Sequence, residues 1–343
     1  MIKKILKVTG IVFIILLISL SAFVYFTVPK LTNETEAVIE SVLKSKIPDF
    51  IKGDSSHIFN GNTKVWYESI KPKDSIKGTV VLFMGISNDA LGWPQAFLDK
   101  LVKSGFHIIR FDYRGTGLSD WCEDNETQLY SLKDIAEDAK IITDSLKIEK
   151  VNLLGVSMGG MVAQEFAINY PKNTKSLTCI MSSGNIIDEK LPEISFKIII
   201  DFIKLNLRYG IFQSEKNTVK LHVSSRMILR GNADYEIDVK ETAEQVLFNL
   251  RNRRGFNPKV SKQHNEAVYR SGSRYEKLKE LKIPMLFIHG LNDPFVPIEH
   301  SKKLADLILD SETKWVENMG HDIPACLIDT ICNKLISFTG KND

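Results

Sequence analysis

The chain has 343 residues, of which 43% are hydrophobic and 25% are charged, a composition typical of a globular protein with a sizeable core. The net charge is +3, but the first 30 residues contain four lysines and no acidic residue, which leaves −1 for the remainder. A nearly neutral body argues against a nucleic-acid partner and against a strongly charged substrate.

The N-terminus combines three lysines among the first seven residues with an uncharged stretch at 8–29. As a helix, that stretch would be about 33 Å long, enough to cross a hydrocarbon core of roughly 30 Å. We therefore predict that residues 1–30 are a membrane anchor, with the lysines on the cytoplasmic side and the rest of the chain outside the cytoplasm. The alternatives are a signal peptide cleaved near 21–22, which would give a secreted protein, and a buried core helix.

Residues 31–56 are polar, mixed in charge and weakly periodic, and we interpret them as a juxtamembrane linker with some helix at 35–46. A single larger domain would then span 57–343. Residues 63–70 alternate in polarity and are rich in β-forming side chains, which predicts an edge strand.

Short apolar runs then alternate with helical stretches. The runs, typical of strands buried on both faces, are 79–83, 107–111, 151–154 and 176–181, and a fifth follows at 283–288. The helical stretches between them are 94–104, 132–146 and 158–170. This alternation predicts an α/β fold with a doubly wound, mostly parallel sheet.

The alternation stops between about 184 and 274, which predicts a helical cap inserted into the domain. Within it, Phe196, Ile199, Ile200, Ile203 and Leu207 share one face of an amphipathic helix. We expect this apolar face either to pack on the body of the domain or to line an acyl or ring pocket.

Ser157 lies in a G-x-S-x-G motif at 155–159, between the predicted strand 151–154 and a helix. A serine hydroxyl becomes a useful nucleophile when a base removes its proton and a tight turn holds it exposed. The glycines two residues before and after the serine suit such a crowded turn. Ser157 is therefore the candidate nucleophile.

His321 is the candidate base among seven histidines. In enzymes with this elbow the order along the chain is serine, acid, histidine. This order excludes the histidines before Ser157, and those of the cap precede any credible acid. We interpret His289 as a loop or core histidine and expect His300 to face solvent, which leaves His321 in a glycine-bearing loop after the short strand 313–316.

Asp293 is the candidate acid because it lies in the turn just after the strand 283–288. There it could accept a hydrogen bond from His321 and hold the imidazole in one tautomer. The alternative role for Asp293 is a turn-former before proline. Asp322 is a poorer candidate, since a sequence neighbour rarely folds back onto the histidine ring.

A developing oxyanion needs two preorganised N–H donors. We expect the backbone N–H of Met158, directly after the nucleophile, and that of Ile86, in the loop after the first buried strand. Asp112 and Arg114 follow the second buried strand and could brace the loops around the site.

These residues resemble the α/β-hydrolase superfamily over about 60–340. The similarity rests on the motifs at 112–119, 155–159, 289–297 and 319–324. Within the superfamily, the chain resembles the branch typified by aclacinomycin methylesterase. The segments that carry this closer resemblance are residues 84–85, followed soon by 93–94, and residues 130–136 and 253–258. The resemblance implies cofactor-independent ester hydrolysis through Ser157, Asp293 and His321. Met84 stands where the commonest superfamily pattern has a histidine.

The sequence therefore predicts a membrane-tethered carboxylic ester hydrolase for an uncharged, partly apolar small molecule. The same triad could instead cleave an amide, a thioester or a C–C bond, because fold does not decide among them. A non-catalytic binding module on the same scaffold is a further alternative. The four cysteines show no C-x-x-C spacing, so we expect neither a zinc nor a redox site, and no essential disulfide. The absence of a cofactor is implied by the family resemblance alone.

Overall fold

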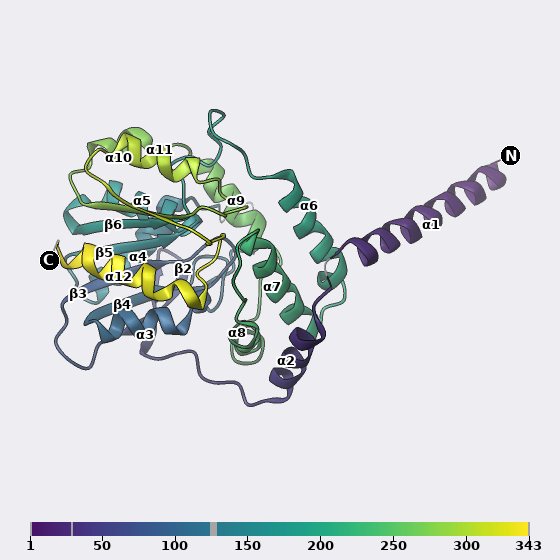
Figure 1. Cartoon of the computed structure of the whole chain (residues 1–343), viewed down its shortest axis with the longest axis horizontal. Helices are drawn as coiled ribbons and strands as arrows, with labels where there is room; N and C mark the ends of the chain where they lie inside the picture. Colours follow the sequence, from purple (N-terminus) through teal and green to yellow (C-terminus); the bar gives the residue numbers. More distant parts are fainter. Residues whose placement is uncertain (1, 29, 124–128, 342–343) are drawn as a thin grey trace.

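A computed structural model describes residues 2–28, 30–123 and 129–341 (Figure 1). Its centre is an eight-stranded sheet in the order β1-β2-β4-β3-β5-β6-β7-β8. β1 pairs with β2 and β2 with β4 in antiparallel fashion, and every other neighbouring pair is parallel. The strands are β1 (Asp54–Asn60), β2 (Thr63–Ile70), β3 (Gly78–Phe83), β4 (Phe106–Phe111), β5 (Val151–Val156), β6 (Thr174–Ile180), β7 (Met285–Gly290) and β8 (Glu312–Val316).

The predicted fold class, α/β with a doubly wound and mostly parallel sheet, is confirmed. The predicted edge position of residues 63–70 is wrong, because β1 covers the outer side of β2 and β2 is an internal strand. The short polar segment at 54–56 gives little periodic signal, so only pairing with β2 reveals that β1 begins at Asp54.

Helices cover both faces of the sheet, and alternate residues of each strand point to opposite sides. Val81, Leu153 and Phe287 pack with α4 (Leu132–Ser145) and α5 (Met158–Asn169), and α10 (Tyr275–Glu280) and α11 (Glu299–Leu307) join the same core. Leu82 and Leu154 pack with α3 (Gln95–Lys103) and α12 (Ile328–Gly340) on the other face. Three short 3-10 segments lie at Ala90–Gly92, Pro171–Asn173 and Ala325–Leu327.

A group of helices, which we call the cap, lies between β6 and β7. It contains α6 (Phe196–Leu205), a π-helical turn η3 (Asn206–Gly210), α7 (Glu215–Arg230), α8 (Val239–Asn252) and α9 (Val260–Ser271). In Figure 1 these helices stand beside the carboxyl-terminal edge of the sheet. The cap therefore covers the edge at which Ser157 lies.

The α6 helix is amphipathic, and its Ile198 and Leu205 side chains are buried. Of the five side chains on the predicted apolar face, Phe196, Ile199 and Ile203 are exposed. The other two are partly buried, and Leu207 packs against the buried cluster that includes Leu205. The packing expected for this face is therefore met only in part.

The segment 31–56 contains the helix α2 (Asn33–Lys44), which the sequence places slightly later, at 35–46. Ile39 and Val42 of α2 are buried against Val219 and Val246 of the cap helices α7 and α8. Ion pairs from Lys216 and Lys220 to α2 carboxylates lie around this contact. This part of the chain before the domain is thus packed against the cap.

The α1 helix (Ile2–Thr27) projects away from the rest of the molecule (Figure 1). Its stretch Leu6–Phe23 is long and apolar enough to cross a membrane and is not buried, although a signal sequence would meet the same description. The interpretation of α1 as a buried core helix is therefore wrong. Met1, Pro29 and residues 342–343 fall within the predicted segments but outside the described residues.

Candidate active site

Ser157 occupies the turn between β5 and α5 with a strained backbone. Its φ is 55° and its ψ is −124°, a conformation that is rare for a residue with a side chain. The surrounding structure holds it there, because its N–H donates to the Ile180 carbonyl (2.9 Å) and its carbonyl accepts from the Ser182 hydroxyl (2.7 Å). This is the geometry of a nucleophile elbow.

The two motif glycines are required because the elbow packs backbone against backbone. A Cβ atom on Gly155 would lie 2.2 Å from the Gly159 carbonyl oxygen, and one on Gly159 would lie 2.0 Å from that of Phe83. Real Cβ atoms do not approach backbone so closely. Any larger residue at either position would therefore push α5 away from the sheet.

His321 and Asp293 meet at the same edge of the sheet from the loops after β8 and β7. The His321 Nδ1 lies 2.7 Å from the Asp293 Oδ2. The other carboxylate oxygen of Asp293 accepts hydrogen bonds from the backbone N–H groups of Phe295 and Val296. Both Asp293 oxygens are therefore held, and Asp293 in turn orients the imidazole.

His289 is a second histidine beside Asp293. The sequence predicts His289 only as a loop or core residue. It is fully buried at the end of β7, and its Nε2 lies 3.2 Å from the Asp293 Oδ2. Its ring is fixed by Ser301 through Nδ1 and by the Val296 carbonyl through Nε2. Desolvation raises the pKa of Asp293, but the positive charge of His321 and the hydrogen bonds from both histidines outweigh it and hold this pKa well below its usual value.

The loop after β3 passes directly beside Ser157, as a candidate oxyanion site requires. A Cβ on Gly85 would lie 3.5 Å from the Ser157 Cβ. Across the residues that the structure describes, the Ile86 N–H donates to no protein acceptor. The Met158 N–H begins α5, where helical donors lack an intrahelical partner. Both candidate donors are thus free to bind an anion.

His264 of the cap helix α9 supports this loop. Its Nδ1 accepts a hydrogen bond from the Ser87 N–H (3.1 Å), and its Nε2 donates to the Arg114 carbonyl (2.9 Å). Ser87 has a φ of 64°, so the loop is strained next to Ile86. Burial lowers the pKa of His264 to about 4, which keeps the ring neutral and able to accept from Ser87.

The cap helix α7 braces the loop that carries His321. The Leu229 carbonyl accepts the His321 N–H (2.8 Å), and a Cβ on Gly320 would meet the Arg230 carbonyl oxygen at 2.3 Å. The Arg226 guanidinium binds the Asp322 carboxylate through both of its oxygens. Asp322 therefore pairs with the cap, in agreement with its rejection as the acid of the triad.

Asp112 and Arg114 both brace loops, but with different partners. Asp112 accepts from the Ala90 and Leu118 N–H groups and pairs with Arg253 of the cap. Burial raises the pKa of Asp112 to about 6 against the opposing effect of Arg253. Arg114 instead pairs with Asp138 on α4.

The prediction that His300 faces solvent is wrong. Its side chain is buried, with Nδ1 2.8 Å from the Ser183 hydroxyl and Nε2 3.1 Å from the Pro192 carbonyl. The chain after β6 folds back over α11 and covers His300, which no local pattern indicates.

All four cysteines carry free thiols. No group of three or more His, Cys, Asp or Glu side chains within 2–28, 30–123 and 129–341 could hold a metal ion.

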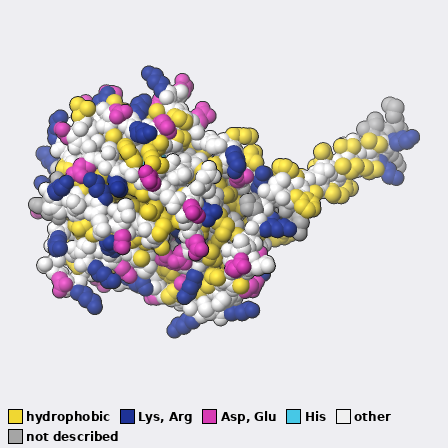
Figure 2. Space-filling view, in the orientation of Figure 1, with side chains coloured by type: hydrophobic (Ala, Val, Ile, Leu, Met, Phe, Trp, Pro, Cys, Tyr) yellow, Lys and Arg dark blue, Asp and Glu magenta, His cyan; other side chains and the backbone are white. Residues whose placement is uncertain are grey.

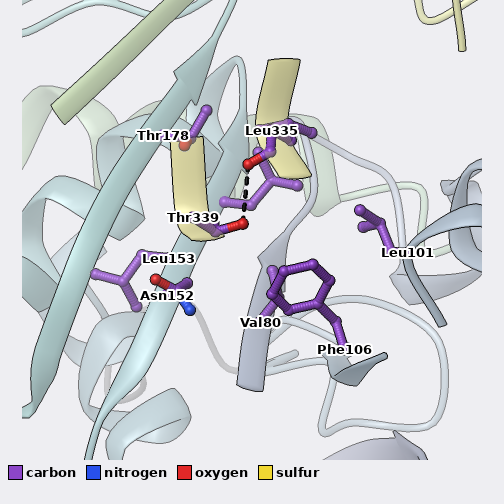
Figure 3. A pocket seen from close by; sticks show the side chains of 9 residues that line it. Val80, Leu101, Phe106, Asn152, Leu153, Thr178, Leu335 and Thr339 are labelled. Atoms are coloured by element: carbon purple, nitrogen blue, oxygen red, sulfur yellow. Dashed lines mark hydrogen bonds between the residues drawn. The ribbon is translucent and has the colours of Figure 1, made fainter. Parts of the chain in front are cut away.

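Figure 3 shows a small cavity elsewhere in the fold, beneath α12. Its volume is about 10 Å³, roughly the room of one water molecule. Asn152 at the amino-terminal end of β5 lines it, whereas Ser157 follows the opposite end of that strand. This cavity is a packing defect and belongs to no substrate site.

Comparison with known proteins places these features in a family. The model of the alpha/beta hydrolase fold matches residues 78–324, most of the chain. That range contains Ser157, Asp293 and His321.

Curated relatives extend over a larger part of the chain. A rhodomycin D methylesterase of Streptomyces peucetius is 24% identical over 294 residues, which cover 82% of this chain and 97% of the relative. A 2-hydroxy-6-oxononadienedioate/2-hydroxy-6-oxononatrienedioate hydrolase of Escherichia coli O81 (strain ED1a) is 26% identical over 256 residues, which cover 71% and 80%. The resemblance to the methylesterase branch is confirmed.

Solved structures show the same fold. An enol-lactonase from Burkholderia xenovorans LB400 aligns with a TM-score of 0.63 at 17% identity, covering 83% of this chain and 99% of the enzyme. A meta-cleavage product hydrolase from Pseudomonas fluorescens IP01 aligns with a TM-score of 0.61 at 19% identity, covering 84% and 98%. The chain belongs to the α/β-hydrolase family and is a hydrolase.

Proposed function

We propose that this protein is a membrane-anchored serine hydrolase that cleaves a carboxylic ester through an acyl-enzyme on Ser157. The observation that carries the proposal is that the strained Ser157 elbow follows β5, and the hydrogen-bonded Asp293 and His321 follow β7 and β8, at the same edge of the parallel strands. Similarity to methylesterases at 24% identity favours an ester. The nearly neutral body favours an uncharged, partly apolar small molecule.

In the first half-reaction, His321 takes the proton of the Ser157 hydroxyl. Because the Nδ1 of His321 faces Asp293, its Nε2 is the nitrogen that accepts this proton. The Ser157 Oγ forms a bond to the ester carbonyl carbon, and the N–H groups of Ile86 and Met158 stabilise the oxyanion. The C–O bond to the alcohol then breaks, and the alcohol leaves with the proton from His321.

In the second half-reaction, water gives a proton to His321 and attacks the acyl carbon. The Ser157 Oγ–acyl bond breaks, the acid is released, and Ser157 recovers its proton from the imidazole. The Asp293 carboxylate stabilises each imidazolium intermediate, and its depressed pKa keeps it ionised throughout.

A fluorophosphonate probe tests whether Ser157 is the nucleophile. We expect labelling of the wild-type chain, no labelling of Ser157→Ala, and normal labelling of Ser261→Ala, which changes an exposed serine of α9. Label retained on Ser157→Ala would refute the assignment. Absence of label on the folded wild-type chain would favour a binding module instead.

Hydrolysis of a C–C bond is the second candidate function. The Escherichia coli relative, whose name describes a dienedioate and trienedioate hydrolase, favours it at 26% identity. A panel of p-nitrophenyl esters of increasing chain length, with matched amides, thioesters and vinylogous diketones, separates these reactions. A preference for any of the other classes over every ester would overturn the choice of ester.

The anchor is also part of the proposal. Three lysines precede the apolar span, so the N-terminus would stay in the cytoplasm and the catalytic domain would lie outside. Membranes washed with carbonate should retain the protein, and its intact mass should include residues 1–30. A mature N-terminus near Phe23 would instead indicate a cleaved signal peptide and a secreted enzyme.

A further inference from the structure

The candidate nucleophile and the candidate base are both nearly buried. Ser157 is 5% exposed and His321 is 8% exposed. A substrate must therefore pass the elements around them, which include the cap helix α7, whose Leu229 carbonyl accepts the His321 N–H. The element of the cap that reaches His321 through aromatic contacts is α6.

The inner side of α6 connects to the base through two rings. The Phe202 ring lies 6.2 Å from that of Phe295, and the Phe295 ring lies 5.0 Å from the imidazole of His321. Phe295 also donates its N–H to the Asp293 carboxylate. A shift of α6 would therefore change the packing directly beside the catalytic pair.

The outer side of α6 is apolar and exposed. Phe196, Ile199 and Ile203 are 74%, 44% and 50% exposed, and we call these three side chains the outer face. Phe212, in the loop that follows η3, is 78% exposed. Isolated apolar residues on a surface are ordinary, but a contiguous helix face of large apolar side chains needs a partner.

Residues next to the outer face contact the base of α1. Arg208 of η3 donates to the Val28 carbonyl (3.3 Å), and Val28 is buried with Leu205 and Tyr209. The Lys204 ammonium, one residue after Ile203, lies 5.2 Å from the ring of Phe23 in the last part of α1. Figures 1 and 2 show α6 running past the point where α1 leaves the cap, with hydrophobic atoms on both helices.

The length of the span sets the level of the membrane surface. The uncharged stretch 8–29 would rise about 33 Å as a helix, close to the thickness of a hydrocarbon core of roughly 30 Å. A core that begins at Val8 ends within the last turn of α1, so Phe23 and the Lys204 ammonium beside it lie about one helical turn from the membrane surface. A lysine there can place its stem along apolar groups and its charge among lipid phosphates.

We infer that α6 is an interfacial lid, which lies in the surface of the bilayer that α1 spans and admits an ester from the lipid phase to Ser157. The inference rests on the proposed anchor and on the proposed hydrolase. The partner of the outer face is the bilayer itself, since the adjoining residues Lys204 and Leu205 of the same helix contact the base of α1. The substrate class is an apolar ester that partitions into the membrane.

Spin labels on the full chain test the position of α6. The chain is reconstituted in nanodiscs of phosphatidylcholine and phosphatidylglycerol, with Cys326→Ser to remove the exposed thiol. Labels are attached at Ile203→Cys, at Leu16→Cys in α1, and at Leu309→Cys, a 90% exposed apolar position after α11. Power saturation should show oxygen-rich lipid surroundings at 203 and 16, and water at 309.

The outcomes separate the lid from the anchor. A label in lipid at 16 but in water at 203 overturns the lid and leaves the anchor standing. A label in water at both 16 and 203 overturns the anchor, and with it the lid.

Hydrolysis tests the delivery of substrate. The variant Ile199→Asn/Ile203→Asn should lose about tenfold in turnover of a long-chain ester dissolved in the nanodisc, because two apolar contacts with lipid are lost. It should keep its activity on p-nitrophenyl acetate in water, and Leu309→Asn should change neither rate. An equal loss on both esters would overturn delivery through α6.

Discussion

The sheet and the cap bury their apolar residues to very different extents. Every residue of β4, β5 and β7 is buried, so the sheet finds all of its packing partners within the chain. The cap helix α6 buries Ile198 and Leu205 but leaves its outer face exposed. The strands β4, β5 and β7 are therefore fully covered by other elements of the chain. The cap, in contrast, has an apolar surface that no element in the described part of the chain covers.

The two regions meet at the candidate catalytic residues. The sheet positions Ser157 and Asp293 through strand ends, while α7 of the cap holds the His321 loop through the Leu229 carbonyl and Arg226. This difference teaches that the sheet determines the chemistry and that the cap determines access and fine positioning. Substitutions in the sheet should consequently have larger effects than substitutions in the cap.

The largest effect is expected from the acid. Asp293→Asn should lower kcat/KM by about 10³–10⁴-fold, because the amide no longer stabilises the imidazolium or selects its tautomer. Asp322→Asn changes the neighbouring carboxylate that Arg226 binds, and should lower kcat/KM by less than about tenfold. Steady-state kinetics on one ester measures both. Similar losses in the two variants would show that the cap is as important to chemistry as the sheet.

Replacing one glycine with alanine in each region compares how much stability an added methyl group costs there. Gly159→Ala should reduce the free energy of unfolding by about 3 kcal/mol, because the new Cβ meets the Phe83 carbonyl. Gly272 ends the cap helix α9 at a φ of 59° and a ψ of −149°, with open space around it, so Gly272→Ala should cost about 2 kcal/mol of backbone strain alone. Urea unfolding measures both values. A larger loss at Gly272 would reverse the comparison.

The smallest expected effect is a pH-dependent change in stability caused by His264, which joins the cap helix α9 to the Ser87 loop. The pKa of His264 is lowered to about 4 from 6.5, so the folded protein binds this proton more weakly than the unfolded chain. The stabilisation from neutral His264 is complete above about pH 6.5 and is lost as the pH falls toward 4. His264→Asn keeps an acceptor and a donor but does not titrate.

Melting temperatures measured between pH 8 and pH 4 test this loss of stability. This pH range includes both the ordinary pKa of histidine, 6.5, and the lowered pKa of His264, about 4. The Tm of the wild-type chain should fall more steeply than that of His264→Asn below about pH 6.5. Parallel curves would show that His264 does not couple the cap to the Ser87 loop through its protonation state.

Much of the fold was predictable because its signals are local. The buried parallel strands appear as apolar runs, and the elbow appears as two glycines around Ser157 between a run and a helix. The placement of Asp293 and His321 at one edge follows from the rule that parallel strands end at the same side of a sheet. Their approach to 2.7 Å agrees with that expectation.

The misplaced residues share a different cause, which is burial by segments distant in sequence. His300 is covered by the chain near Pro192, and β2 is covered by β1. His289 could have been suspected only from its position four residues before Asp293, and its contact with the carboxylate depends on how the turn after β7 folds. Periodicity describes which side chains share a face and says nothing about what that face meets.

By itself, the sequence determined the α/β class, the elbow, the candidate triad and the apolar N-terminal span, since each depends on spacing along one segment. Only the tertiary structure decided that α2 packs on the cap, that α7 braces the His321 loop, and that α6 leaves its outer face exposed. The physical reason is that packing depends on contacts between segments tens to hundreds of residues apart. The local sequence pattern predicts the helices and strands, whereas the packing partners of each element depend on the fold as a whole.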